Sequence, residues 1–364
     1  MTAPPKKKSE ILPLGKLRIG LLKDIFQEYK NTEIMENLEK FEKLGLHNSY
    51  ENSKDRVKMG FAIGEDAAVI DMDSHYLVSK TDPITFATDK IGYYVVNVNA
   101  NDIVTTGAVP KWFQATILLP ESSTTDELAK SICIDIQRAC LKLGICLIGG
   151  HTEVTYGLNR PIVIGSMIGE VSKKDYVETC GGKPGDAIIL TKGIPLEGTS
   201  LIAREKENIL EKKGLDKNLI NKAKKMLHDP GISVMKEALL AVKHFDIHSM
   251  HDPTEGGLSM ALVEMAEASN CGLKIHYEDI PIIPEGKIIC DIFNLDPLRV
   301  ISSGSLLIGI EERNCEPLLD LLHNNGIEAG KIGNLTETKG YKIEKNGILQ
   351  DLKYTEKDEI TKIL

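Results

Sequence analysis

The sequence has few of the features that are typical of membrane, secreted or nucleic-acid-binding proteins. Aromatic residues make up only 5% of the 364 residues, and Trp112 is the single tryptophan. Lys and Arg (44) are outnumbered by Asp and Glu (53), which gives a formal net charge of −9. Nucleic acid is therefore not an expected partner, because phosphate binding depends on clustered cations and base stacking depends on aromatic rings. No apolar run approaches the roughly 20 residues that cross a bilayer.

Cysteine pairs and the two commonest nucleotide-binding motifs are also missing. The seven cysteines contain no CxxC pair, which argues against a disulfide framework or a zinc ribbon, so we expect reduced and mostly buried thiols. The basic cluster Lys6–Lys8 has no apolar core behind it, which predicts a cytoplasmic protein without a secretion signal. Neither GxxxxGK[ST] nor GxGxxG occurs.

The pattern of apolar residues predicts an α+β protein rather than a doubly wound sheet, because strands and helices do not alternate regularly. Helices are expected over 17–28, 32–44, 91–106, 124–143, 199–207, 217–228, 232–243, 257–269 and 315–325, and strands over 67–71, 76–81, 112–118, 145–148, 161–168, 187–191, 247–250, 272–276 and 305–311. The clearest helix starts with a capping box of Thr124 and Glu127 and stops at Gly144. A charged, glycine-rich stretch near 170–186 separates an N-terminal domain (1–170) from a C-terminal domain (171–345), which a tail (346–364) follows.

Four aspartates stand beside glycines or at strand ends: Asp66 in GEDAAVI, Asp82 in KTDPIT, Asp102 in VNANDIVTTGAVP and Asp252 in HDPTEGGL. Each segment alone is ordinary turn chemistry. Asp102 is the most informative, because it interrupts an apolar helix and a buried carboxylate needs a partner or a cation. If the four converge, their mutual repulsion favours a divalent ion, and oxygen ligands of this kind suit Mg²⁺.

Two glycine pairs, Gly149–Gly150 and Gly256–Gly257, would let backbone N–H groups approach a phosphate. The alternative for the first pair is that it simply ends a buried strand. Together with the aspartates, the glycines predict a magnesium–nucleotide site.

These segments, in this order, resemble the AIR synthase (PurM-like) superfamily of ATP-using enzymes, which includes thiamine-monophosphate kinase, selenophosphate synthetase and the hydrogenase-maturation protein HypE. GEDAAVI is similar to the family's GDDAAV, TDPIT to its TTD segment, NANDIVTTGAVP to its NDLAVMGAKP and GGHTEV to its GGDTKV. HDPTEGGL is similar to HDPTRGGL of HypE, and KPGDAIIL to the usual start of the second domain. The resemblance covers about residues 12–335.

The resemblance implies a two-domain PurM-like fold that forms a homodimer, with ATP and Mg²⁺ in a cleft between the domains. It makes Asp66, Asp82, Asp102 and Asp252 metal ligands and assigns Asp102, Lys80 and His151 to catalysis. The residues that it places on the nucleotide are Gly64, Asn99, Asn101, Gly149, Gly150, Thr152, Gly256, Gly257 and Lys16, the last on an N-terminal segment with Gly15 that often closes over the phosphates.

The sequence departs from the family pattern at three points. His151 replaces the acid of GGDT, so one metal ligand is lost or moves to Glu153, because a neutral imidazole binds Mg²⁺ poorly. Lys80 stands where Ser or Thr is common and could neutralise phosphate charge. No cysteine follows Cys315, whereas HypE carries its reaction on a C-terminal cysteine, so HypE's own conversion of that cysteine is not expected.

The other members fit less well. Selenophosphate synthetase has an early catalytic Cys or selenocysteine, but no cysteine precedes Cys133. Thiamine-monophosphate kinase would have MDISDGL in place of HDPTEGGL, and AIR synthase would have GGET.

The leading hypothesis is an ATP-dependent, Mg²⁺-requiring HypE-like enzyme that phosphorylates an amide or carboxamide oxygen of an unknown acceptor. The alternatives are a non-catalytic nucleotide-binding accessory protein that acts with a maturation partner, another superfamily activity, or binding of another phosphorylated metabolite. Two smaller questions stay open. His244, His248 and His251 could form a transition-metal site or be unrelated, and the SSGS segment at 302–305 could border the substrate pocket or be a plain turn.

Overall fold

The computed structural model describes residues 17, 19–31, 52–62, 64–355 and 357–363. Gly15, Lys16 and the helix expected over 32–44 lie outside these residues. The N-terminal half contains α1 (Ile19–Asn31), β1 (Val57–Met59), β2 (Ala68–Asp71), β3 (Tyr76–Ile84), α4 (Ile91–Val104), β4 (Val109–Pro120), α5 (Asp126–Leu143), β5 (Cys146–Thr155) and β6 (Ile162–Val171).

The C-terminal half is larger and more helical. It contains β7 (Ala187–Thr191), α6 (Leu196–Glu205), α7 (Glu207–Lys212), α8 (Lys217–Lys225), α9 (Met235–His244), β8 (Ser249–His251), α10 (Gly257–Ala268), β9 (Gly272–His276), α11 (Pro284–Phe293), β10 (Leu307–Ile310), α12 (Cys315–Asn324), β11 (Ala329–Thr336), β12 (Tyr341–Lys345), β13 (Ile348–Asp351) and the short 3₁₀ helix η6 (Glu359–Lys362). The strands expected over 272–276 and 187–191 are β9 and β7, whereas α11 and β11–β13 were not expected.

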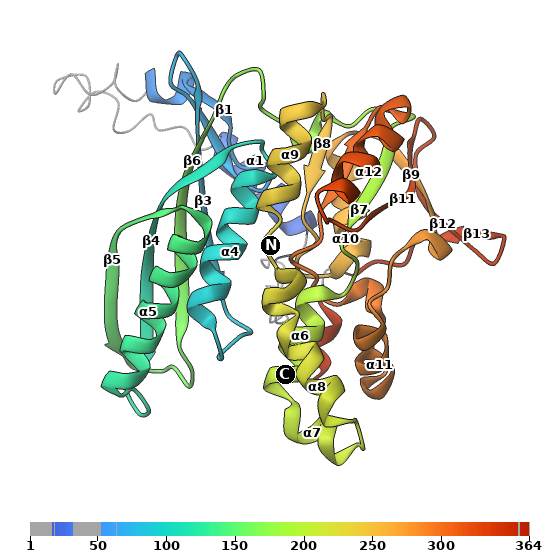
Figure 1. Ribbon diagram of the computed structural model, residues 1–364. Coiled ribbons are helices and arrows are strands. Elements are labelled where there is room, and N and C mark those ends of the chain that lie inside the picture. Colours follow the sequence, from blue (N-terminus) through green and yellow to red (C-terminus); the bar gives the residue numbers. More distant parts are fainter. Residues whose placement is uncertain (1–16, 18, 32–51, 63, 356, 364) are drawn as a thin grey trace, which may run out of the picture.

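A six-stranded sheet, in the order β1-β2-β3-β6-β4-β5, forms the N-terminal half. Alternate residues of β6, such as Val163 and Met167, are fully buried, whereas Ile164 and Ile168, which follow each of them, are partly exposed. Helices α4 and α5 cover the buried face, and among the described elements no helix packs on the other face (Figure 1).

The second sheet has seven strands, in the order β13-β12-β9-β11-β7-β10-β8. All five residues of β7 are buried, because Ile188 and Leu190 pack with α10 on one face while Ala187 and Ile189 pack with α9 and α12 on the other. Strand β13 extends this sheet beyond residue 345, into the range that the sequence assigned to a tail.

Helix α4 lies between the two halves, and every one of its residues is buried (Figure 1). The asparagines that interrupt its apolar sequence are accommodated by hydrogen bonds to backbone carbonyls one turn earlier: Asn97 Nδ2 donates to Tyr93 O (2.8 Å) and Asn99 Nδ2 to Val95 O (2.8 Å). Asn101 bridges the halves, because its Nδ2 donates to Ile232 O (2.8 Å) and its Oδ1 accepts from Val234 N (2.9 Å).

Helix α5 begins one residue later than the capping box predicted. Thr125 is the N-cap, and its hydroxyl accepts from Leu128 N (3.2 Å). Thr124 instead donates its hydroxyl hydrogen to Pro120 O (2.6 Å) in the turn before the helix. Gly144 ends the helix with φ 71°, as predicted.

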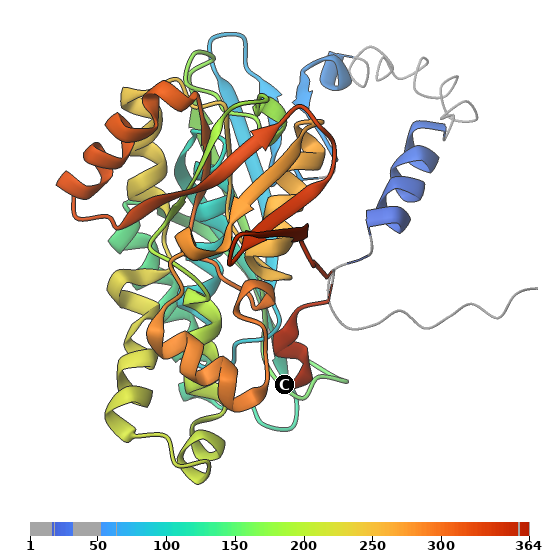
Figure 2. The ribbon, with the colours of Figure 1, turned by 90° about the vertical axis from the view of Figure 1, so that its right-hand side faces the viewer.

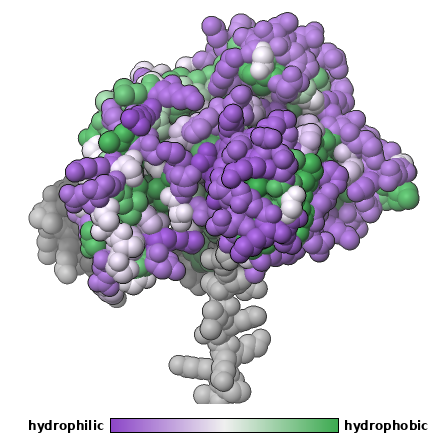
Figure 3. Space-filling view, turned by 60° about the horizontal axis from the view of Figure 1, so that its bottom comes forward, coloured by the Kyte–Doolittle hydropathy of each residue, from purple (hydrophilic) through white to green (hydrophobic). Residues whose placement is uncertain are grey.

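The surface gives no sign of a membrane-spanning segment within the described residues, where no helix is both long and apolar enough to cross a bilayer. The face seen in Figure 3 is mostly hydrophilic, with hydrophobic residues in small separate groups. Helix α1 stands at one side of the C-terminal half (Figure 2), where Lys23 Nζ contacts Glu267 Oε1 of α10 at 2.5 Å. All seven cysteines are free thiols, and four of them are buried.

Candidate functional site

The four predicted aspartates converge at the seam between the two halves. Asp66 precedes β2, Asp82 lies in β3, Asp102 lies in the last turn of α4 and Asp252 follows β8. Asp102 and Asp252 are almost fully buried. Burial raises the pKa of Asp102 well above its ordinary value, and the negative charges of Asp252, Asp82 and Asp66 raise it further against the opposing effect of Lys80. These carboxylates therefore act on one another electrostatically.

Lys80 supplies a positive charge to this cluster from β3. Its Nζ lies 3.1 Å from Asp102 Oδ2 and 3.8 Å from Asp82 Oδ2. Burial alone would lower the pKa of Lys80, but Asp102, Asp82 and Asp66 outweigh this effect and raise it. Lys80 is therefore a fixed cation among the aspartates.

His251 is a second cation in the cluster, whereas the sequence suggested it only as a possible member of a transition-metal site with His244 and His248. Its Nδ1 lies 2.8 Å from Asp66 Oδ2 and its Nε2 lies 3.0 Å from Glu264 Oε2. Burial would lower the pKa of His251, but the two carboxylates raise it well above the ordinary value. Glu264 on α10 was not predicted, because nothing in its local sequence marks it.

The ligand atoms of Asp66, His251 and Asp252 all lie within 4.8 Å of one another, and no other group of three such side chains was found in the described part of the chain. The chemistry of the surrounding donors suits a hard cation, since five carboxyl groups (Asp66, Asp82, Asp102, Asp252 and Glu264) gather here with the two cations Lys80 and His251. This excess of oxygen ligands is what Mg²⁺ binds, usually together with water and phosphate.

The segment GGHT lies apart from this cluster within one chain. The strand that was expected to end at Gly149 and Gly150 continues as β5 to Thr155. It can continue because the two residues are glycines: a Cβ on Gly150 would lie 2.1 Å from Ala115 O of the neighbouring strand. The expectation that this strand is buried was also wrong, because β5 is an edge strand and nearly all of its residues are exposed.

The register of the sheet gives the separation between GGHT and the aspartates. Asp82 pairs with Gly165, which pairs with Ala115, which pairs with Gly150. Three strand spacings correspond to about 14 Å. His151 and Thr152 follow Gly150 on the same exposed strand, and His151 Nε2 contacts Glu153 Oε2 at 3.2 Å.

The remaining predicted residues surround the seam in different ways. Asn99 lies next to Asp82, because its Nδ2 also donates to Asp82 O at 3.2 Å. Asn101 joins the two halves rather than facing the aspartates. Gly64, with φ +79°, packs on α10, and Gly256 and Gly257, with φ +84° and +64°, form the start of that helix.

A carboxylate from the same chain lies at the start of α10. Gly256 N donates to Asp358 Oδ2 (2.8 Å), and Ile360 N donates to Asp358 Oδ1 (2.8 Å). Burial raises the pKa of Asp358 to about 7, although both of these hydrogen bonds oppose the rise. The C-terminal segment is thereby attached to the HDPTEGGL motif, which sequence reasoning did not foresee.

A small cavity of about 30 Å³ opens beside Asp82. Its polar wall contains Glu197 at the start of α6, Thr254, Glu255 and Ser303, so the SSGS segment does border a pocket at the seam. Burial raises the pKa of Glu197 to about 8; Ser303 opposes this rise, and Glu255 and Asp358 add to it.

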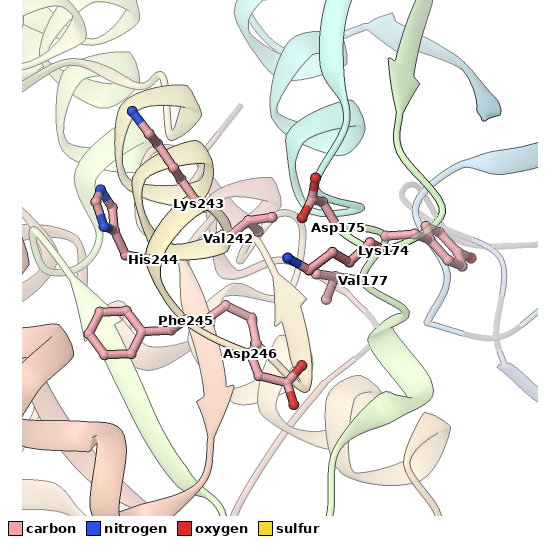
Figure 4. Close-up of a pocket in the computed structure, with 10 residues that line it drawn as sticks. Lys174, Asp175, Val177, Val242, Lys243, His244, Phe245 and Asp246 are labelled. Carbon is pink, nitrogen blue, oxygen red and sulfur yellow. The ribbon is translucent and has the colours of Figure 1, made fainter. Parts of the chain in front are cut away.

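The three histidines do not form a metal site. His244 lines a separate pocket of about 350 Å³. Figure 4 shows His244 across that pocket from Lys174 and Asp175 of the linker. His248 Nδ1 contacts Asp186 (2.9 Å), whereas His251 belongs to the aspartate cluster.

Comparison with known proteins matches both halves of the chain. Residues 64–171 match the N-terminal domain of AIR synthase related proteins, and residues 183–346 match their C-terminal domain. A hydrogenase expression/formation protein of Methanocaldococcus jannaschii is 32% identical over 78% of this chain and 80% of its own length. The carbamoyl dehydratase HypE of Rhizobium leguminosarum bv. viciae is 27% identical over 77% of this chain and 79% of its own.

The fold is also that of HypE. The crystal structure of the hydrogenase maturation protein HypE in complex with ATP matches with a TM-score of 0.66 at 22% identity, over 80% of this chain and 88% of that one. The two-domain PurM-like fold implied by the sequence motifs is therefore confirmed. The chain belongs to the AIR synthase related family, in its HypE-like branch.

Proposed function

We propose that the protein is an ATP-dependent, Mg²⁺-requiring HypE-like enzyme that transfers the γ-phosphoryl group to an amide or carboxamide oxygen of an acceptor. The observation that carries this proposal is the convergence of Asp66, Asp82, Asp102 and Asp252 at the seam. The carbamoyl dehydratase activity named for one relative and the ATP bound to a protein of the same fold support it.

The aspartates would hold Mg²⁺, and Mg²⁺ would neutralise phosphate charge during phosphoryl transfer. Lys80 contributes a further positive charge next to the same site. Its Nζ lies beside Asp102 and Asp82, and its charge opposes the rise in the pKa of Asp102 that burial and the other carboxylates cause. The side-chain amide of Asn99 donates a hydrogen bond to the backbone carbonyl of Asp82 and so helps to fix the position of this residue.

We also propose a homodimer, formed by the open face and edge of the N-terminal sheet. Ile164 and Ile168 are partly exposed on this face, and Ile148 (52% exposed) and Val154 (57% exposed) lie on the edge strand β5. Unpaired edge strands are normally protected, and a second copy would cover both features. The same dimer would bring His151, Thr152 and the glycines of β5 to the partner.

The alternative is a nucleotide-binding accessory protein in a maturation pathway. The observation that favours it is that Lys80 and His251 already pair with four of the carboxylates at the seam, counting Glu264. Carboxylates that are already paired with cations of the protein would attract a bound metal ion less strongly.

Formation of ADP separates the two proposals. The wild type is incubated with ATP and Mg²⁺ or with ATP and EDTA, with and without small amides as acceptors. If the protein is the proposed enzyme, ADP should form in a Mg²⁺-dependent manner. If it is an accessory protein, it should bind the nucleotide but form no ADP under any of these conditions.

The first prediction concerns Asp102→Asn, which should decrease ADP formation by about 100-fold or more, because preorganised charge at the transferring phosphoryl group is lost. Asp126→Asn is the matched control, since Asp126 lies exposed on α5 far from the seam and should keep full activity. Full Mg-ATP affinity and activity in Asp102→Asn would contradict the assigned site.

A further inference from the structure

A second cavity between the two halves, of about 380 Å³, lies on the far side of α4 from the aspartate cluster. Tyr93 and Asn97 of α4 line it, together with parts of the segments 228–237 and 326–328 from the C-terminal half. Asp102 is five positions after Asn97 and nine after Tyr93, which places it about 140–180° away around the helix. The cavity, here called the Asn97 cavity, is therefore separate from the seam, and its volume is typical of small-molecule sites.

Asn97 contributes a buried hydrogen-bond acceptor that has no partner. The residue is 1% exposed, and its Oδ1 accepts no hydrogen bond from any described residue. The orientation of its amide is fixed, because Nδ2 donates to Tyr93 O (2.8 Å) and the reverse orientation would bring two oxygens together. An unpartnered buried acceptor is unfavourable by about 1–3 kcal/mol. A ligand that donates an N–H group to Asn97 Oδ1 would remove this penalty.

A buried ion pair makes the opposite wall of the Asn97 cavity rigid. Lys192 Nζ lies 2.8 Å from Glu237 Oε1, and their side chains are 8% and 2% exposed. The same ammonium group donates to Gly231 O (3.2 Å) and to Ser233 O (2.5 Å). Lys192 therefore holds the segment 231–233 and α9 in place, and its charge is already balanced by Glu237.

Four charged side chains line the exposed part of the Asn97 cavity. They are the cations Lys142 and Lys236 and the anions Asp229 and Glu328, and none of them forms an ion pair with a described residue. Lys142 lies deepest with respect to α4, because its Nζ is 5.8 Å from the centre of the Tyr93 ring.

The surroundings of His228 show that the electric field beside Tyr93 is positive. The rings of His228 and Tyr93 are in contact, with 4.4 Å between their centres. The pKa of His228 is lowered, against the weaker effect of one carboxylate, by partial burial and by the positive charges of Arg204, Lys142 and Lys90. A negatively charged ligand group is therefore favoured beside Tyr93 and near Lys142.

These features define the chemistry of a ligand. Asn97 requires an N–H donor, and Lys142 favours a negative charge. The rings and aliphatic side chains between them, including Tyr93, Leu143 and Ile327, suit a planar body of low polarity. Tyr93 and Asn97 are one helical turn apart, so one small molecule can satisfy both requirements.

We propose that the Asn97 cavity is a second ligand site, which binds a planar organic anion that carries a ring N–H group. The N–H group donates to Asn97 Oδ1, the ring lies against Tyr93, and the anionic group lies near Lys142. This chemistry occurs in heteroaromatic carboxylic acids and in pyrimidine nucleotides, which differ in the distance between ring and anion. The site lies outside the proposed phosphoryl-transfer site and does not depend on that function.

Two sets of probes test the site by isothermal titration calorimetry of the full chain. Orotate has both groups, whereas uracil lacks the anion and benzoate lacks the N–H; UMP, uridine and ribose 5-phosphate form the corresponding nucleotide set. The first member of one set should bind about tenfold or more tightly than the other two, because it alone makes both interactions. The set that shows this preference identifies the source of the ligand. No preference in either set would overturn the proposal.

Asn97→Leu removes the acceptor and keeps the approximate shape of the side chain. The variant should fold, because an apolar group replaces a buried oxygen without a partner. The preferred probe should then lose about tenfold in affinity, whereas benzoate and ribose 5-phosphate should bind as before. An unchanged preference in the folded variant would overturn the proposal.

Lys142→Met should have the complementary effect, weakening the anionic probes and leaving uracil and uridine unchanged. Lys130→Met is the matched control, because Lys130 is 73% exposed on the same helix and does not line the cavity. Asp102→Asn distinguishes this site from the seam. The preferred probe should bind Asp102→Asn as tightly as the wild type, and loss of its binding there would assign the probe to the nucleotide site and overturn the proposal.

Discussion

Lys80 is the residue on which the charge balance of the aspartate cluster most clearly depends. Replacing it with Met removes the ammonium group 3.1 Å from buried Asp102 and leaves the negative charges of Asp252, Asp82 and Asp66 near that carboxyl group unopposed by Lys80. Loss of one partner of a buried ion pair typically lowers the free energy of unfolding by about 3–5 kcal/mol. Lys80→Met should therefore be destabilised by roughly this amount in EDTA, as measured by urea unfolding.

Magnesium should recover part of this loss, because a divalent ion takes over the neutralisation of the same carboxylates. Lys111→Met is the control: Lys111 is half exposed in an ion pair with Glu170, and such pairs contribute about 0–1 kcal/mol. If Lys80→Met were as stable as the wild type in EDTA, the pairing of Lys80 with Asp102 would not be important for the cluster.

At the residue scale, the sequence predicted the aspartates better than their partners. Asp66, Asp82, Asp102 and Asp252 stand out locally, because each interrupts an apolar stretch or accompanies a turn. His251 does not reveal its role locally, since its partner Asp66 is 185 residues away in the sequence. Glu197 and Glu264 were missed for the same reason: each is an ordinary helix residue until the fold places it at the seam.

At the element scale, the C-terminal segment with η6 can be tested through Asp358. The pKa of Asp358 is about 7 in the native protein because of burial, whereas an aspartate in the unfolded chain ionises near 3.8. Between these values the native state holds the proton and the unfolded state releases it, so stability falls as pH rises from about 4 to about 7.

Asp358→Asn should remove this component of the pH dependence. The difference in unfolding free energy between wild type and variant should change by a few kcal/mol across this range, at about 1.4 kcal/mol per pKa unit, and level off above pH 7. Only the slope of this difference against pH tests the pKa shift. Its absolute value does not, because asparagine also loses one of the two accepted hydrogen bonds at every pH. Parallel curves for the two proteins, from thermal unfolding at several pH values, would refute the assigned pKa shift.

Elements with a strong local pattern, such as α5 and β3, were predicted well, and those held by distant contacts were not. β11 contains Gly330 and Gly333, which are poor strand formers, yet it lies between β7 and β9 and gains its hydrogen bonds from both. α11 starts at Pro284 and has Gly286 in its first turn, and its sequence alone did not predict a helix. The continuation of β5 through two glycines likewise depends on β4, which no local pattern reveals.

For the whole molecule, the open sheet face predicts association of two copies. Ile164→Lys places a charge in the middle of this face and should convert the dimer to a monomer in sedimentation velocity experiments. Ile209→Lys on α7 is the control, because Ile209 is equally apolar and 41% exposed but lies in the other half of the chain. A wild type that is monomeric at micromolar concentration would contradict the proposed dimer.

Residues of β5 could contribute to the site of their own chain or to the site of the partner in a dimer. Within one chain, three strand spacings separate Gly150 from Asp82, so His151 and the aspartates would meet only across the dimer.

Asp102→Asn and His151→Ala should each be inactive alone. If β5 acts on the partner, a mixed dimer has one doubly altered site and one intact site, so random mixing restores about a quarter of wild-type ADP formation. If β5 acts within its own chain, every site carries one substitution and mixing restores nothing. Mixing Asp102→Asn with Asp82→Asn is the control, because both residues serve the same site and no intact site can form.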